Sequence, residues 1–243
     1  MITGAGRGIG AATARLFAKK GMDVVINYRE NQASAENLCA EILGFGGVAQ
    51  VIQADISVET EVQKLFKEID SRMGRIDVLV NNAGILLRQS KLVDFSADRL
   101  QKIMQTNVIG AFICCREALL RMSYKSGGKG GVIVNVSSLA AQLGAPNEYI
   151  DYAASKGAID TLTRGLALEV AREGVRVNAV RPGLIETEIH ASGGEPGRVE
   201  RLKSKIPLGR GGTAEEVAEA IWWLASDQSA YTTGAFIDVS GGR

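Results

Sequence analysis

Apolar runs of strand length alternate with segments of helical periodicity, and this alternation constrains the fold more than any other feature. Its clearest unit has an apolar run at 132–136, a helical segment at 152–172 and a second apolar run at 175–180. Two strands joined by a crossover helix pair in parallel, and parallel sheets are covered by helices on both faces. We therefore predict an α/β fold whose strands end at one edge, where open α/β sheets bind ligands.

Further elements follow the same pattern. Strands are expected at 24–29, 48–53, 76–80 and 235–239, and helices at 33–43, 58–73, 98–124 and 213–225. The last helix begins with a capping box, Thr213 and Glu216. Only Met1 and Ile2 precede the first turn, so either the natural chain begins upstream or the first strand is unusually short. At 243 residues, 46% of them apolar, we expect one domain spanning 1–243.

Charge and composition exclude several classes of function. Lys plus Arg number 28 and Asp plus Glu 27, so no strong field attracts nucleic acid or a membrane surface. The single His and the three Cys have no metal-ligand spacing, so we expect no metal. Adjacent Cys114 and Cys115 suit buried thiols in a reducing compartment. With neither a secretory signal nor an apolar run near 18 residues, we expect a cytoplasmic protein without a membrane span.

A glycine-rich turn opens the chain. Thr3 and Gly4 are followed by Gly8 and Gly10, and an Ala-rich helical segment begins there. Glycines let the backbone approach a phosphate, and the free N–H groups of a helix N-terminus favour its charge. No Lys-Ser/Thr pair follows, as a P-loop of a kinase or ATPase requires. The turn therefore predicts a dinucleotide site, with a packing role as the alternative.

The end of the second strand indicates which dinucleotide binds. An acidic residue there binds the ribose 2′-hydroxyl of NAD, whereas a basic residue accommodates the 2′-phosphate of NADP. This chain has Tyr28 and Arg29 at that point, and Arg7 in the glycine-rich turn is a second candidate cation. We therefore predict NADP rather than NAD, with solvated surface charges as the alternative for either Arg.

The fourth strand leads into small and amide residues, Asn81-Asn82-Ala83-Gly84. Such residues let the backbone approach a cofactor, while the amides hold strand ends together. Asn107 lies in the middle of the next helical segment, where a buried amide needs hydrogen-bond partners. It is either a satisfied core residue or part of the site.

Tyr152 and Lys156 are one helical turn apart, so both side chains can reach the same space. A unit cation about 4 Å from a phenol, at an effective dielectric near 20, favours the phenolate by about 4 kcal/mol, or roughly three pKa units. This predicts a tyrosine that exchanges protons near neutral pH. Ser137 and Ser138 end the preceding strand and are expected at the same edge.

Taken together and in this order, these motifs resemble the short-chain dehydrogenase/reductase family in its compact form. The resemblance implies a Rossmann-type, doubly wound parallel sheet of seven strands in the order 3-2-1-4-5-6-7, usually in a homotetramer built on the helices at 98–124 and 152–172. By position, Tyr152 would be the general acid/base and Lys156 would lower its pKa and hold the nicotinamide ribose. Ser138 would orient the substrate oxygen, and Asn107 would fix a water beside Lys156.

The resemblance also carries over a set of cofactor contacts. They are Gly4, Arg7, Gly8, Ile9, Gly10, Tyr28, Arg29, Asp55, Ile56, Asn82, Ala83, Gly84, Tyr152, Lys156, Pro182, Gly183, Ile185 and Thr187. Residues 184–205 resemble the substrate loop of the family, and His190 within it is expected at the rim. Ile85, Leu86, Leu87 and Leu143 suggest an apolar substrate lining.

One departure concerns the spacing of Ser138 and Tyr152, which is about one residue longer than in many members. An insertion at 144–151 is expected, and Ser137 is the second candidate for the hydroxyl role.

We therefore predict an NADP-dependent oxidoreductase that interconverts a carbonyl and a secondary alcohol of a small molecule. The chain looks most like oxoacyl-thioester reductases and glucose dehydrogenases. Docking of an acyl carrier would need basic residues, for which Lys129 and Arg172 are candidates. The alternative is a regulatory protein that binds NADP without turnover, but such proteins usually lose the tyrosine or the lysine.

Overall fold

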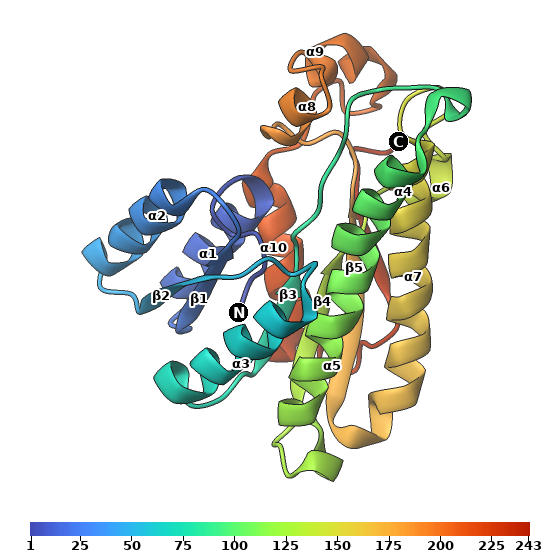
Figure 1. Cartoon of the computed structure of the whole chain (residues 1–243). Helices are drawn as coiled ribbons and strands as arrows, with labels where there is room; N and C mark the ends of the chain where they lie inside the picture. Colours follow the sequence, from blue (N-terminus) through green and yellow to red (C-terminus); the bar gives the residue numbers. More distant parts are fainter.

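A parallel sheet runs through the centre of the computed structural model, which describes residues 1–243 (Figure 1). Its strands are β1 (Val24–Tyr28), β2 (Ala49–Gln53), β3 (Val78–Asn81), β4 (Gly131–Val136), β5 (Val175–Pro182) and β6 (Phe236–Val239). β1 pairs with β2, and β3 to β6 pair in sequence order. Ile2 joins the two groups through bridges to Ile26 and Val80. The predicted order 3-2-1-4-5-6-7 is confirmed, with Ile2 in place of the first strand.

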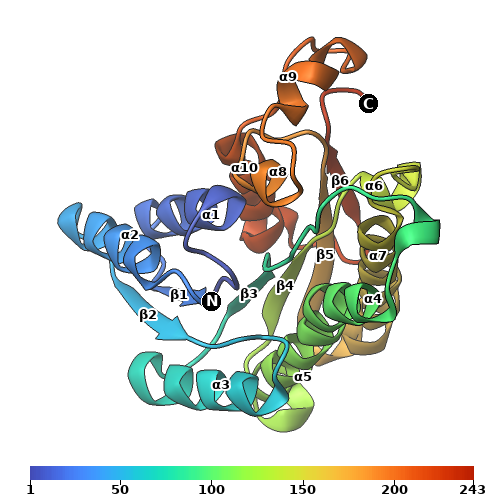
Figure 2. The same ribbon diagram turned by 45° about the horizontal axis from the view of Figure 1, so that its top comes forward.

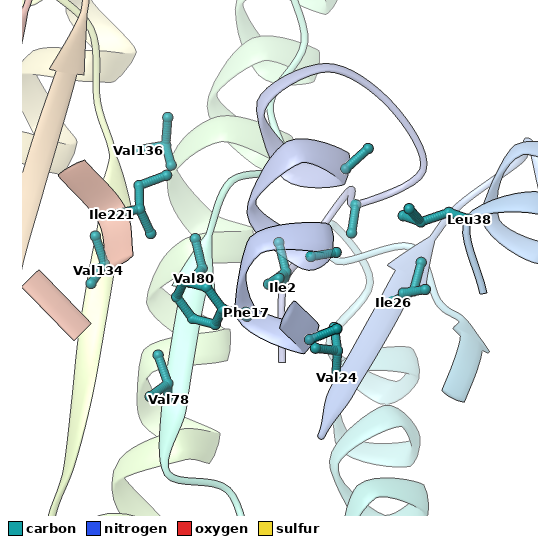
Figure 3. Packing of buried hydrophobic residues seen from close by; sticks show 14 of the residues in the cluster. Ile2, Phe17, Val24, Ile26, Leu38, Val78, Val80, Val134, Val136 and Ile221 are labelled. Atoms are coloured by element: carbon teal, nitrogen blue, oxygen red, sulfur yellow. The ribbon is translucent and has the colours of Figure 1, made fainter. Parts of the chain in front are cut away.

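At the central position of the sheet, only Ile2 forms β-bridges to the neighbouring strands. The amide of Ile2 donates to the carbonyl of Val25 at 3.0 Å, and that of Thr3 donates to Val80 at 3.0 Å. Ile2 itself is buried between the two groups of strands (Figure 3). Its apolar side chain, more than an extended hydrogen-bond ladder, closes the core at this point.

Helices cover both faces of the sheet (Figure 2). One face carries α1 (Gly8–Lys19), α2 (Gln32–Gly44) and α10 (Ala214–Ala225). The other carries α3 (Glu59–Met73), α4 (Ala97–Met104), α5 (Gly110–Met122) and α7 (Ile150–Val170). Short helices α6 (Ala140–Leu143), α8 (Ile189–Ser192) and α9 (Arg198–Leu202) lie beyond the carboxyl edge of the strands. This arrangement is the doubly wound α/β fold expected from the alternation of elements.

Alternate strand residues enter the two cores. Val78 and Val80 pack under α1 and α10, whereas Leu79 between them packs under α5. Because a strand in such a sheet is buried on both faces, it is apolar throughout, which explains the continuous apolar runs of the sequence. The capping box predicted for α10 is present, with Thr213 and Glu216 bonded to each other's backbone N–H.

The helix predicted at 98–124 spans Ala97–Met122. A π-helical turn at Gln105–Ile109 joins its two α-helical parts, α4 and α5. By length and composition this segment is apolar enough to cross a membrane, contrary to the expectation that no such run exists. However, 56% of its apolar window is buried inside the protein. It packs on α3 and on the sheet as a core helix does.

Candidate active site

A cleft of about 910 Å³ opens at the carboxyl ends of the strands, where the alternation of elements predicts a ligand site. Residues that follow β1 to β5 line it, together with the segment that carries α8 and α9. Of the predicted site residues it brings together Gly4, Arg7, Gly8, Ile9, Tyr28, Arg29, Asp55, Ile56, Asn82, Ala83, Gly84, Ser138, Tyr152, Lys156, Pro182, Gly183, Ile185 and Thr187. Gly10 and Asn107 lie behind this surface.

The glycine-rich turn forms a cradle at the N-terminus of α1. Gly4 and Gly8 have positive φ of 60° and 54°, which glycine adopts without strain. A Cβ on Gly4 would stand 3.0 Å from Ala83, so a larger residue would close the narrow space between the turn and the end of β3. Free N–H groups at the start of a helix suit a pyrophosphate, and this shape therefore fits a dinucleotide.

The ends of neighbouring strands are tied together beside this turn. The Thr3 hydroxyl accepts from the N–H groups of Asn82 at 3.0 Å and Ala83 at 2.9 Å. The Asn82 amide in turn donates to the carbonyls of Thr3 at 2.9 Å and Gly4 at 3.1 Å. The expectation that amides hold the strand ends together is met at Asn82, and Thr3 is a partner that the sequence alone did not indicate.

Gly10, expected to contact the cofactor, does not line the cleft. A Cβ at this position would lie 2.5 Å from Asn82 Nδ2 and 2.9 Å from both Ala5 Cα and Gly4 O. Two of these atoms belong to the backbone and cannot move aside. Gly10 therefore serves the packing of α1 against the turn.

We expect Gly10→Ala to lower the free energy of unfolding by about 1–3 kcal/mol, as overpacking does. Gly44→Ala, at the end of α2 with nothing within 4 Å of the added Cβ, is the matched control and should be neutral or stabilising. Thermal unfolding without cofactor measures both. Equal melting temperatures for the two variants would show that the space around Gly10 relaxes freely.

The adenosine end of the cleft holds cations and carboxylates side by side. Arg29 pairs with Glu30 at 2.5 Å and lies 3.8 Å from Asp55 Oδ2. Arg7 is exposed and forms no ion pair. A 2′-phosphate at this end would therefore share Arg29 with two carboxylates, a competition that the sequence did not reveal.

Tyr152 and Lys156 meet at the opposite end of the cleft, both on α7. The Lys156 ammonium lies 5.5 Å from the centre of the Tyr152 ring and donates to the carbonyl of Val136 at 2.7 Å. The Ser138 hydroxyl lies close enough to Tyr152 to lower the pKa of the phenol. A Cβ built on Gly84 would stand 3.5 Å from Lys156 Nζ, so the end of β3 leaves room beside the ammonium.

The prediction that Lys156 lowers the pKa of Tyr152 toward neutral is wrong for this structure. Burial raises the pKa of Tyr152 to about 12, and hydrogen bonding with Ser138 only partly offsets this rise. Burial also lowers the pKa of Lys156 to about 8. The ammonium donates to a backbone carbonyl instead of the phenol, so the loss of hydration outweighs their attraction. Tyr152 is consequently protonated at neutral pH, the state that a proton donor needs.

Asn107 acts from behind the cleft. It lies in the π-helical turn, is 2% exposed, and holds Ile85 by accepting from its N–H at 2.8 Å and donating to its carbonyl at 3.0 Å. Its amide also donates to Ser155 at 3.1 Å. The extra residue of a π turn re-aims a side chain, as it often does at functional sites. Asn107 thus fixes the backbone that passes Lys156.

The two adjacent serines face different partners. Ser138 accepts from the Ala140 N–H at 3.1 Å and meets Tyr152. Ser137 is 2% exposed and donates to Asp160 Oδ1 at 2.6 Å. Both serines follow the end of β4 at Val136, and their side chains contact different neighbours. Ser138 is therefore the hydroxyl available beside the tyrosine, and Ser137 is the weaker candidate.

The loop between Ser138 and Tyr152, where the insertion is expected, turns sharply. Ala145 and Asn147 have positive φ of 44° and 63°, a conformation that costs about 1–2 kcal/mol in residues other than glycine. Tyr149 in this loop donates to the carbonyl of Gly193 at 3.1 Å, between α8 and α9. The loop and the expected substrate segment thus form one wall of the cleft.

This wall combines apolar side chains with the charged Glu148, Arg198 and Arg201, and it contains one buried imidazole. Ile85, Leu86 and Leu143 line the cleft as expected, but Leu87 does not. His190, expected at the rim, is instead 8% exposed. Its Nε2 lies 2.9 Å from the Ile185 carbonyl, its Nδ1 has no partner, and burial lowers its pKa. His190 is therefore neutral at pH 7 and unsuited to donate a proton from Nδ1.

The two basic residues considered for acyl-carrier docking lie far from the cleft mouth. Lys129 precedes β4 and Arg172 precedes β5, so both lie at the amino ends of strands. The cleft opens at the carboxyl ends. Because parallel strands place all their amino ends at one edge, these two residues cannot guide a carrier to the cleft.

Comparison with known proteins gives the same picture. Residues 4–243 match the family model described as enoyl-(acyl carrier protein) reductase. The uncharacterized oxidoreductase YgfF of Escherichia coli K12 is 57% identical to this chain; the alignment covers all of this chain and 98% of YgfF. Glucose 1-dehydrogenase 2 of Bacillus subtilis 168 is 38% identical; that alignment covers all of this chain and 93% of the dehydrogenase. A crystal structure of 3-ketoacyl-(acyl-carrier-protein) reductase from Brucella melitensis complexed with NADH superposes with a TM-score of 0.92 at 35% identity, covering all of this chain and 96% of that one.

Proposed function

The chain belongs to the short-chain dehydrogenase/reductase family, and we propose that it is an NADP(H)-dependent oxidoreductase interconverting a small-molecule carbonyl and a secondary alcohol. The observation that carries the proposal is that Ser138, Tyr152 and Lys156 share one cleft with a glycine cradle at a helix N-terminus. The first three supply proton chemistry, and the cradle supplies a seat for a dinucleotide. We treat residues 1–243 as a single catalytic domain, with 184–205 as its substrate loop.

The cofactor would lie along the line of expected contacts. Gly4, Gly8 and Ile9 would hold its pyrophosphate, Arg29 and Asp55 its adenosine end, and Lys156 the ribose next to the nicotinamide. Asn82, Ala83 and Gly84 would border it from the end of β3, and Pro182, Gly183, Ile185 and Thr187 from the segment after β5. When bound, it supplies or accepts the hydride.

Tyr152 and Ser138 would act on the oxygen of the substrate. In the reductive direction both hydroxyls hydrogen-bond the carbonyl oxygen, and Tyr152 donates its proton as negative charge develops there. A pKa near 12 keeps this proton in place until the substrate oxygen becomes basic. Lys156 adds positive charge beside the phenol as it loses the proton, and the preorganised donors lower the barrier.

An assay of NADPH oxidation with ketones, sugars and oxoacyl thioesters tests the proposal. Turnover of at least one class, with the alcohol as product, is the expected result. If the protein binds NADPH but turns over none of them, the alternative of a regulatory nucleotide-binding protein is favoured. The relatives include a glucose 1-dehydrogenase and a 3-ketoacyl-(acyl-carrier-protein) reductase, so the panel must include both classes.

We expect the wild type to prefer NADPH over NADH by about tenfold in kcat/KM. Charge-assisted hydrogen bonds from Arg29 and Arg7 to a 2′-phosphate favour NADPH, while solvent screening and the pairing of Arg29 with Glu30 reduce the gain. Arg29→Ala should shrink this preference. Glu30→Gln, which releases Arg29 from its shortest ion pair, should increase it. Steady-state kinetics with both cofactors measure the ratio, and equal wild-type values for NADH and NADPH would rule out the assignment.

We also propose a cytoplasmic homotetramer. An apolar stripe of half-exposed side chains follows the outer face of the α4–α5 segment: Leu100, Met104, Ile109, Phe112 and Leu120. The neighbouring face of α7 carries Leu168, which is 80% exposed, and the small residues Gly157 and Gly165. Two such helix faces can pack against those of a second copy, because glycines allow close approach of backbones.

A further inference from the structure

A buried charge cluster lies behind Lys156, on the side away from the cleft. Asp160, one turn further along α7, is 9% exposed and accepts from the Ser137 hydroxyl at 2.6 Å. Its other carboxylate oxygen accepts from Arg181 on β5, from Nε at 2.9 Å and from Nη2 at 2.8 Å. Ser137 also approaches the backbone carbonyl of Lys156 at 3.3 Å. The cluster joins α7, β4 and β5 at the turn that carries Lys156.

Few other polar groups face the Lys156 ammonium. On α7 the Tyr152 ring lies 5.5 Å from the ammonium, and Asp160 lies one turn after Lys156 on the same helix. β4 contributes the carbonyl of Val136, and the π-helical turn contributes the neutral amide of Asn107 across Gly84. On the far side of Asp160, β5 contributes Arg181, which binds that carboxylate, and β6 contributes Asp238, 3.6 Å from Arg181. Asp160 is therefore the carboxylate that acts on the lysine.

We propose that Asp160 is a positioning residue for Lys156: its buried carboxylate keeps the ammonium charged inside the protein, and Arg181 limits that effect by neutralising part of the carboxylate. The inference rests on the proposed function, in which Lys156 must be charged to assist Tyr152. Asp160 does not line the cleft, so it acts through Lys156 and touches neither cofactor nor substrate.

Burial and the charge of Asp160 shift the pKa of Lys156 in opposite directions. Lys156 is 4% exposed, and burial lowers its pKa to about 8, while the charge of Asp160 raises it. A lysine with a pKa near 8 is mostly charged at pH 7 and mostly neutral at pH 9. Without the carboxylate, the pKa of Lys156 falls further, so a larger share of the lysine is neutral at pH 7. Activity that needs the ammonium is then lost at a lower pH.

Substitutions of the two members of the ion pair should shift the pH dependence of kcat/KM in opposite directions. Asp160→Asn keeps the shape of the side chain and removes the negative charge, so kcat/KM should fall with rising pH about one pH unit earlier than in the wild type. Arg181→Gln leaves Asp160 charged and less neutralised, so the same decline should move to higher pH. Arg181 keeps Asp238 and the ring of Phe236, 4.0 Å away, when Asp160 is replaced.

Profiles of kcat/KM against pH from 6 to 10, measured with the substrate found by the panel, test the proposal. Glu169→Gln removes an exposed carboxylate from the same helix and should leave the profile unchanged. Opposite displacements for Asp160→Asn and Arg181→Gln support the inference, because general destabilisation would move both variants alike. Coincident profiles for these variants and the wild type would overturn the inference. Turnover by the wild-type enzyme would still support the proposed function in that case.

A second readout does not depend on turnover. The Lys156 Cε resonance of ¹³C-lysine-labelled protein, assigned by its absence in Lys156→Arg, reports the titration of the ammonium directly. Asp160→Asn should lower the midpoint by about one pH unit, and Arg181→Gln should raise it. An unchanged midpoint in Asp160→Asn would overturn the inference even if no substrate is found. If Asp160→Asn does not fold, the rise in Arg181→Gln still decides the question.

Discussion

Tyr152→Phe is expected to reduce kcat by at least about 10²-fold, because it removes only the proton that passes to the substrate oxygen. The ring remains, so its packing on α7 and the neighbouring Lys156 stay in place. Affinity for NADPH should therefore be nearly unchanged. Steady-state kinetics give the first quantity, and a titration of cofactor fluorescence gives the second.

Tyr124→Phe provides the matched control for this change. Tyr124 lies beyond the end of α5 and is exposed, so the same removal of a hydroxyl should leave kcat at the wild-type value. A Tyr152→Phe enzyme that keeps more than about a tenth of the wild-type activity would contradict a general-acid role. Loss of NADPH binding as well would indicate a structural effect instead.

Lys156→Ala is expected to affect both binding and chemistry. The ammonium would hold the nicotinamide ribose and also assist Tyr152, so its removal should raise the KM for NADPH and lower kcat by at least about 10²-fold. A fall in kcat alone would show that the ribose contact is wrong. Lys156→Met retains most of the side-chain volume and serves as the control for a cavity.

Lys156→Met is also expected to change the stability of the protein. The folded protein lowers the pKa of Lys156 from 10.5 to about 8, so below pH 8 the charged lysine favours the unfolded chain by about 3 kcal/mol. This penalty fades as the pH rises from about 8 to 10.5. Replacement by an uncharged Met removes it, and loss of the bond to Val136 costs about 1 kcal/mol.

Lys156→Met should therefore gain about 2 kcal/mol of unfolding free energy at pH 7 and little at pH 10, while its activity is lost. Chemical denaturation of the protein at both pH values measures this difference. A destabilised Lys156→Met at pH 7 would show that the lysine contributes more to the fold than its burial costs.

Local patterns determined the elements and the centre of the site. Continuous apolar runs predicted the buried parallel strands because both faces of each strand are covered. The four-residue spacing of Tyr152 and Lys156 placed both on one side of α7, since that spacing is a property of the helix alone. The resemblance to the family supplied the strand order, which no local pattern contains.

Tertiary structure decided what lies around each of these residues. The pKa of Tyr152, the pairing of Arg29 with Asp55, the packing role of Gly10 and the pair Asp160–Arg181 all depend on residues about 14 to 72 positions apart in the chain. Burial and charge arise from such neighbours and from excluded water, which spacing along the sequence does not describe. The sequence by itself therefore determined most of the groups that meet in the cleft, and only the folded chain decided their protonation and their partners.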